Sequence, residues 1–198
     1  MAVFKLGESN APITPVAHTL DEAIRSWCDK VNVIVSYRLL YGCHIEIKGT
    51  TYRFSLDRDD QLDLVMDTAD ANLSLYLSNL PESTRRSQYP IGNYPTALSD
   101  TWSTTWQGIC TDGTKTLLKM DVTTYLSFAM QINAFLKKEL ANGRKKKLTL
   151  RSASTFAELD AVATGLRIND MYTLVRDAQH LTNVKTKLDK IEDSLPSY

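Results

Sequence analysis

Residues 49–66, GTTYRFSLDRDDQLDLVM, and residues 113–130, GTKTLLKMDVTTYLSFAM, present the same pattern 64 positions apart. Each copy begins with Gly-Thr, continues through an apolar return segment, and reaches an Asp that precedes apolar residues at three- and four-residue spacing. A glycine between alternating segments predicts a β-hairpin. An Asp before helical spacing predicts the start of a helix. The sequence therefore predicts two hairpin-plus-helix units.

The first unit is predicted to have strands at 43–47 and 51–56, followed by a helix opened by Asp57. The side chains expected on the inner face of its hairpin are Ile45, Ile47, Tyr52, Phe54 and Leu56. Those expected on the buried stripe of its helix are Leu62, Val65, Met66, Ala69, Leu73 and Leu77.

The second unit is predicted to have strands at 102–110 and 116–120 and a helix from Asp121. The apolar positions of that helix are Tyr125, Phe128, Ala129, Ile132, Phe135, Leu136 and Leu140. Asn142-Gly143 is a natural helix end, although a helix that continues through residue 150 is also compatible with the pattern.

Three further segments complete the chain. A helix that starts with the capping box Thr19 and Glu22 should stop at Gly42, with residues 31–40 compatible with either helix or strand. The predicted divisions are the N-terminal helix and first unit at 1–79, a linker or long loop at 80–100, the second unit at 101–165, and a C-terminal helix for association at 166–198. The fold class is α+β, with a projecting, amphipathic C-terminal helix.

The overall composition excludes some partners. The chain has 23 basic and 23 acidic residues, so its formal net charge is zero. This balance gives no electrostatic support for nucleic acid or a membrane as a partner, and we expect neither. No apolar run approaches the length of a membrane span, the first residues lack a secretory signal, and three cysteines without a CxxC pair fit a reducing cytoplasm.

No residue pattern indicates a catalytic or metal site, so we expect a protein that is not an enzyme and needs no cofactor. The three histidines lack paired ligand spacing. Asp57–Asp60 lacks the glycine and glutamate of a calcium loop. The basic run Arg144–Lys147 lacks interleaved aromatics, and it fits a solvated surface or a contact with an acidic protein patch better than a nucleic acid.

Two sets of side chains are the candidate binding residues. Trp102, Trp106, Tyr89 and Tyr94 are possible ligand-facing aromatics, although packing against the following helix explains the tryptophans more simply. The last helix carries a narrow apolar seam on an otherwise polar surface, which is typical of a helix that binds a partner. Its partner-binding residues are Met171, Leu174, Leu181, Leu188, Ile191 and Leu195.

Residues 43–162 resemble an uncharacterised domain common in tail and tail-fibre-associated proteins of bacteriophages and prophages. The resemblance uses the strand with Trp102 and Trp106, the turn Asp112-Gly113-Thr114, the helix opened by Asp121 and, above all, the ending ASTFAELDAV at 153–162. That domain brings no catalytic residues. It implies a virion protein of the tail, assembled in the cytoplasm of the host bacterium.

We therefore expect a structural component at the baseplate or tail-fibre attachment. Its expected partners are other tail or baseplate proteins, the tail fibre, and a second copy bound through the C-terminal helix. Two alternatives stay open. One is a fibre-assembly chaperone that is absent from the mature virion, and the other is a receptor- or glycan-binding tail module.

Overall fold

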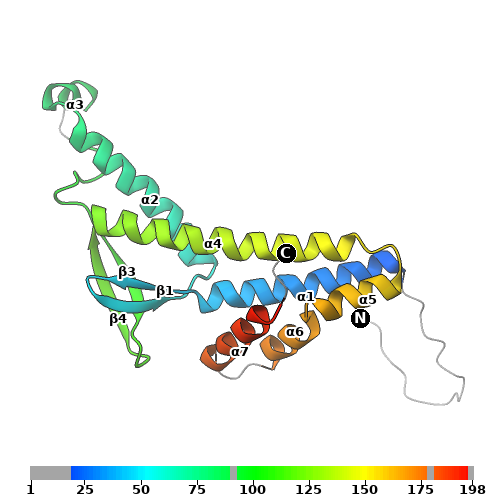
Figure 1. Ribbon diagram of the computed structural model, residues 1–198. Helices are drawn as coiled ribbons and strands as arrows, with labels where there is room; N and C mark the ends of the chain where they lie inside the picture. Colours follow the sequence, from blue (N-terminus) through cyan, green and yellow to red (C-terminus); the bar gives the residue numbers. More distant parts are fainter. Residues whose placement is uncertain (1–18, 90–92, 178–180, 196–198) are drawn as a thin grey trace, which may run out of the picture.

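The computed structural model describes residues 19–89, 93–177 and 181–195, and its mixture of helices with one antiparallel sheet confirms the α+β class. The elements in chain order are α1 (Leu20–Tyr41), β1 (Cys43–Ile47), β2 (Thr50–Phe54), α2 (Arg58–Asn79), α3 (Glu82–Gln88), β3 (Ser103–Ile109), β4 (Lys115–Asp121), α4 (Val122–Arg151), α5 (Phe156–Gly165), α6 (Ile168–Arg176) and α7 (Leu181–Asp193). The long helices α1 and α4 run antiparallel side by side, with the sheet at one end and α5 at the other (Figure 1).

The two predicted hairpins share one sheet, in which the strand order is β1-β2-β3-β4. The hairpins β1–β2 and β3–β4 are each antiparallel, and β2 meets β3 at the pair Arg53 and Ile109. The turn glycines Gly49 and Gly113 have φ angles of 80° and 89°. This left-handed conformation explains why both copies of the pattern place a glycine there.

Both aspartates of the pattern are N-caps, as predicted. The Asp57 carboxylate accepts from the backbone N–H groups of Asp59 and Asp60, and the Asp121 carboxylate accepts from that of Thr124 at 2.8 Å. The capping box of Thr19 and Glu22 is also present.

For two helices the sequence left a shorter and a longer alternative, and in the structure both helices have the longer one. α1 stays helical through residues 31–40 and ends before Gly42, as predicted. α4 passes through Asn142-Gly143 without a break. Gly143 is buried against α1, where an added Cβ would lie 2.7 Å from Val35 Cγ2. The glycine therefore permits close approach of two helices and does not end one.

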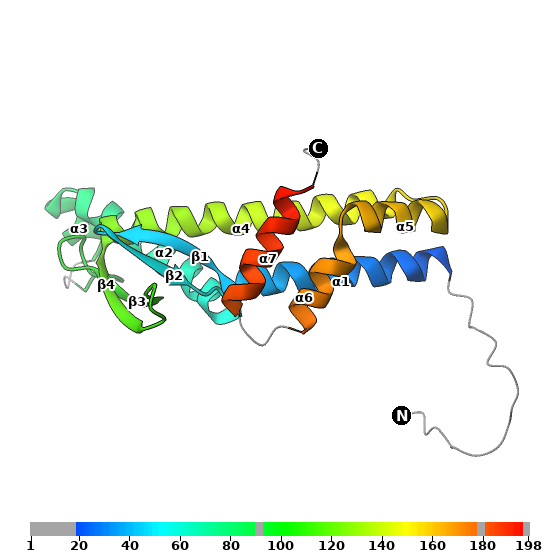
Figure 2. The same cartoon turned by 60° about the horizontal axis from the view of Figure 1, so that its bottom comes forward.

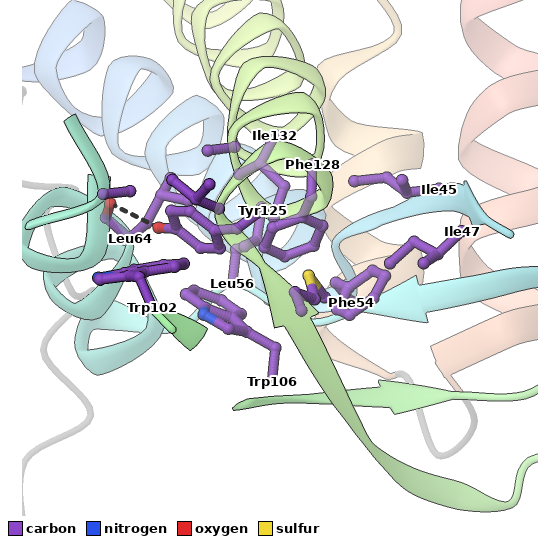
Figure 3. Packing of buried hydrophobic residues seen from close by; sticks show 14 residues of the cluster. Ile45, Ile47, Phe54, Leu56, Leu64, Trp102, Trp106, Tyr125, Phe128 and Ile132 are labelled. Atoms are coloured by element: carbon purple, nitrogen blue, oxygen red, sulfur yellow. Dashed lines mark hydrogen bonds between the residues drawn. The ribbon is translucent and has the colours of Figure 1, made fainter. Parts of the chain in front are cut away.

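The described residues bury two hydrophobic clusters, and α4 contributes to both. The first lies under the sheet and is filled by the strands, α2 and the N-terminal half of α4 (Figure 3). The second is filled by α1, the end of α4, and helices α5 to α7. α1 consequently packs with the C-terminal helices, although it directly precedes the first hairpin in sequence.

The remaining segments differ in how far the structure describes them. The expected linker at 80–100 contains α3, which lies at the tip of the molecule beyond the end of α2 (Figure 1). Residues 1–18 lie outside the described residues. Within the described part of the chain, no helix is both long and apolar enough to cross a bilayer.

Candidate interaction surfaces

The two tryptophans are core residues. Trp102 and Trp106 are only 5% and 7% exposed. The ring centroid of Trp102 lies 5.4 Å from that of Tyr125, and the centroid of Trp106 lies 5.0 Å from that of Phe128 (Figure 3). The prediction that they face a ligand is therefore wrong, and the simpler interpretation, packing on the following helix, is confirmed.

Both indole N–H groups are bound by carboxylates of α2. Trp102 Nε1 donates to Asp70 at 2.7 Å, and Trp106 Nε1 donates to Asp67 at 3.0 Å. Asp67 also accepts from the Thr104 hydroxyl at 2.8 Å. A buried indole N–H needs an acceptor, so these bonds set the rotation of α2 about its own axis.

Tyr125 of α4 holds the same helix from another side. Its hydroxyl donates to the Leu64 carbonyl oxygen at 3.1 Å (Figure 3). The same hydroxyl lies 3.3 Å from the Thr68 hydroxyl. Burial raises the pKa of Tyr125 to about 12. The phenol is therefore a neutral hydrogen-bond donor at physiological pH.

This orientation leaves an apolar face of α2 in solvent. The side chains turned inward and buried are Leu64, Ala71, Ser74 and Leu77. The opposite side of the helix carries what we call the α2 face: Leu62, Val65, Met66, Ala69, Leu73 and Tyr76. Leu62, Val65 and Met66 are 57%, 65% and 60% exposed, Tyr76 is 55% exposed, and Leu73 is half-buried.

The predicted buried stripe of this helix is thus wrong for Leu62, Val65, Met66 and Ala69, and right for Leu77. The physical reason is that α2 has apolar residues on two opposite faces. Helical spacing identifies both, but the carboxylate–indole bonds decide which one packs inward. In the second unit the expected residues Tyr125, Phe128, Ala129 and Ile132 are buried, Phe135 and Leu136 are half-buried, and Leu140 is 41% exposed.

The predicted C-terminal seam lies inside the fold. The single expected helix is divided into α6 and α7, which pack obliquely across α1 instead of projecting (Figures 1 and 2). Met171 and Leu188 are fully buried and Ile191 is 7% exposed, so these three are not free to bind a partner. Leu174 and Leu195 are half-buried, and the Leu181 side chain lies outside the described residues.

A charge cluster built on a buried arginine ties α7 to the two long helices. Arg38 of α1 is 3% exposed, and its guanidinium lies 3.9 Å from Glu139 of α4, 3.2 Å from Asp189 and 3.3 Å from Glu192. Glu192 also accepts from Lys146, a member of the basic run, at 2.6 Å. Since a buried arginine requires such partners, this cluster explains why α7 packs against the body.

The remaining candidates offer little chemistry. Tyr89 and Tyr94 are half-buried and face each other edge to face, with centroids 5.9 Å apart. Burial raises the pKa of the Cys43 thiol to about 11, so this thiol is protonated and unreactive near neutral pH. No group of three or more His, Cys, Asp or Glu side chains within 19–89, 93–177 and 181–195 is arranged to hold a metal ion.

Five of the six residues of the α2 face were expected from the sequence as an apolar stripe, but they were assigned to the core, so the exposed surface that they form was missed. Its signal was present in the sequence as a second apolar line on the helix, offset from Leu64 and Ala71. Comparison with protein-family models, with curated proteins and with solved structures found no match to this chain.

Proposed function

We propose that this chain is a structural, non-enzymatic subunit that assembles with other proteins through the α2 face. One observation carries the proposal: six apolar side chains follow one face of a four-turn stretch of helix, and four of them are more than half exposed. Contiguous exposed apolar surface on a water-soluble protein marks an interaction site. Without such a role, an exposed apolar surface of this kind would only promote aggregation.

Within this proposal the setting is a bacteriophage tail, at the baseplate or the tail-fibre attachment. Support for the setting comes from the resemblance of residues 43–162, above all from the ending at 153–162. A fibre-assembly chaperone would use the same face, so it stays the alternative. The glycan-binding alternative has lost its main support because Trp102 and Trp106 are buried.

Mass spectrometry of purified phage particles tests the proposal. A structural subunit is expected in a fixed ratio to the other tail proteins. Absence from finished particles, combined with loss of fibres when the gene is deleted, would identify the chaperone instead. Intact, infectious particles from the deletion strain would contradict both.

A pair of variants tests the role of the α2 face in the same system. Leu62→Ser combined with Met66→Ser should prevent incorporation. The matched control is Leu117→Ser combined with Leu148→Ser, because these leucines are 69% and 65% exposed on other elements. If the control pair blocks incorporation and the α2 pair does not, the assembly surface lies elsewhere.

A further inference from the structure

The α2 face has the geometry of one strand of a coiled coil. Leu62, Met66, Ala69, Leu73 and Tyr76 follow one another at spacings of four, three, four and three residues. This alternation keeps one line of side chains toward a neighbouring helix. The line from Leu62 to Tyr76 extends about 21 Å at the helical rise of about 1.5 Å per residue.

One edge of this line is acidic. Asp63 and Asp70 each directly follow a residue of the line, at the flanking position where coiled coils select partners by charge. Asp59 lies one turn before Asp63 and three residues before Leu62, so it stands at the N-terminal end of the line itself. All three aspartates are exposed. One oxygen of Asp70 is engaged by Trp102, as described above. The opposite edge carries the neutral residues Val65 and Asn72.

We propose that the α2 face binds an amphipathic α-helix of another protein, which carries its own apolar seam flanked on one side by Lys or Arg. This inference rests on the proposed function and specifies the class of partner. Apolar contacts along the seam supply most of the affinity, and pairing with Asp59, Asp63 and Asp70 selects the partner and its direction.

A second copy of this chain fits less well. In an antiparallel pair of α2 helices, equal edges meet, so Asp63 and Asp70 of one copy would face the carboxylates of the other. In a parallel pair they would face the neutral edge with Val65 and Asn72, which offers no charge to pair with. The outward line of α4 is no better, because Lys137 and Arg144 occupy the seam positions between Ala134, Ala141 and Leu148. Those charges would be buried against leucine and methionine.

The experiment measures binding of two synthetic 21-residue helical peptides to the full chain by fluorescence anisotropy. Both peptides have the same leucine seam; one has lysine at the flanking positions and the other has glutamate. The lysine peptide should bind at least about tenfold more tightly at low salt, since three attractions replace three repulsions. The difference should shrink at high salt.

Variants of the chain separate the two contributions. Met66→Ser should weaken binding of both peptides. Asp59→Asn combined with Asp63→Asn should reduce the preference for lysine to the part that Asp70 supplies, and it should leave binding of the glutamate peptide unchanged or improved. Asp112→Asn, which removes a carboxylate from the hairpin turn far along the chain, is the control and should change neither. Circular dichroism shows that each variant is folded.

Four results would overturn the inference. One is equal binding of both peptides, and another is binding that survives Met66→Ser. The third is concentration-dependent self-association that Met66→Ser abolishes, which would make a second copy the occupant. The fourth is that no peptide binds although the α2 pair of variants blocks incorporation. In the third and fourth cases the proposed assembly function stands while the basic-helix partner fails.

Discussion

The sequence predicts that Leu188 lies on an exposed seam and that Leu62 lies in the core, whereas the structure buries Leu188 and exposes Leu62. Truncating each leucine to alanine distinguishes the predicted environments from the observed ones. Leu188 is fully buried in α7, so Leu188→Ala removes buried carbon atoms and leaves a cavity. Such substitutions cost about 2–5 kcal/mol of unfolding free energy. Leu62 is 57% exposed. Less than half of its surface is removed from water, so Leu62→Ala should cost about 1 kcal/mol or less.

Equilibrium unfolding in urea, followed by circular dichroism, gives both free energies. Leucine and alanine are both strong helix formers, so differences in helix propensity contribute little. Lys187→Ala, on the exposed side of α7, is the control for a change in that helix and should shift the unfolding free energy by no more than about 0.5 kcal/mol. If Leu62→Ala proved the more damaging of the two leucine variants, the described orientations of both α2 and α7 would be refuted.

Three further predictions concern other positions. Gly143→Ala should destabilise the protein by about 1–3 kcal/mol because its Cβ would meet Val35, and adding Val35→Ala should recover part of the loss in thermal unfolding. The Thr124 backbone N–H holds the pKa of Asp121 below its usual 3.8, so the ionised cap stabilises the fold above that pH and is lost as the pH falls through the lower folded value. Asp121→Ala should therefore cost about 1 kcal/mol at pH 7, and a cost that did not shrink in acid would contradict the capping role. The raised pKa of Tyr125 favours its neutral form in the fold, so stability should fall as the pH rises from about 10 to about 12. Tyr125→Phe should reduce this alkaline loss of stability, which urea unfolding at each pH measures. The same substitution should cost about 1 kcal/mol of unfolding free energy at pH 7.

The local signals in the sequence predict much of the fold because they act over a few residues. Gly49 and Gly113 mark hairpin turns that require a left-handed backbone, and Asp57 and Asp121 mark helix starts that require an acceptor. Such requirements are independent of the rest of the chain. The pattern therefore predicts both hairpins and the helices that follow them.

The surfaces could not be predicted in the same way, because burial depends on contacts between distant segments. The rotation of α2 depends on Trp102 and Trp106, which lie 32 and 39 residues from their carboxylate partners. The packing of α7 depends on Arg38, which lies 151 residues from Asp189. The sequence of α2 shows two apolar lines, and that of the C-terminal segment shows a single narrow one. In neither case does the apolar pattern show which side of the helix meets partners from distant parts of the chain.

Protection from chemical labelling at positions 66 and 130 is the sharpest test of whether the α2 face is the assembly surface. These methionines occupy equivalent positions in the two copies of the pattern and are 60% and 73% exposed. Each is replaced by cysteine in a separate variant and labelled with a maleimide, and the labelled peptide is quantified by mass spectrometry in the free chain and in assembled particles. If the α2 face is the assembly surface, both cysteines should be labelled rapidly in the free chain, and position 66, but not position 130, should be strongly protected after assembly. Equal labelling at position 66 in the two states would contradict it.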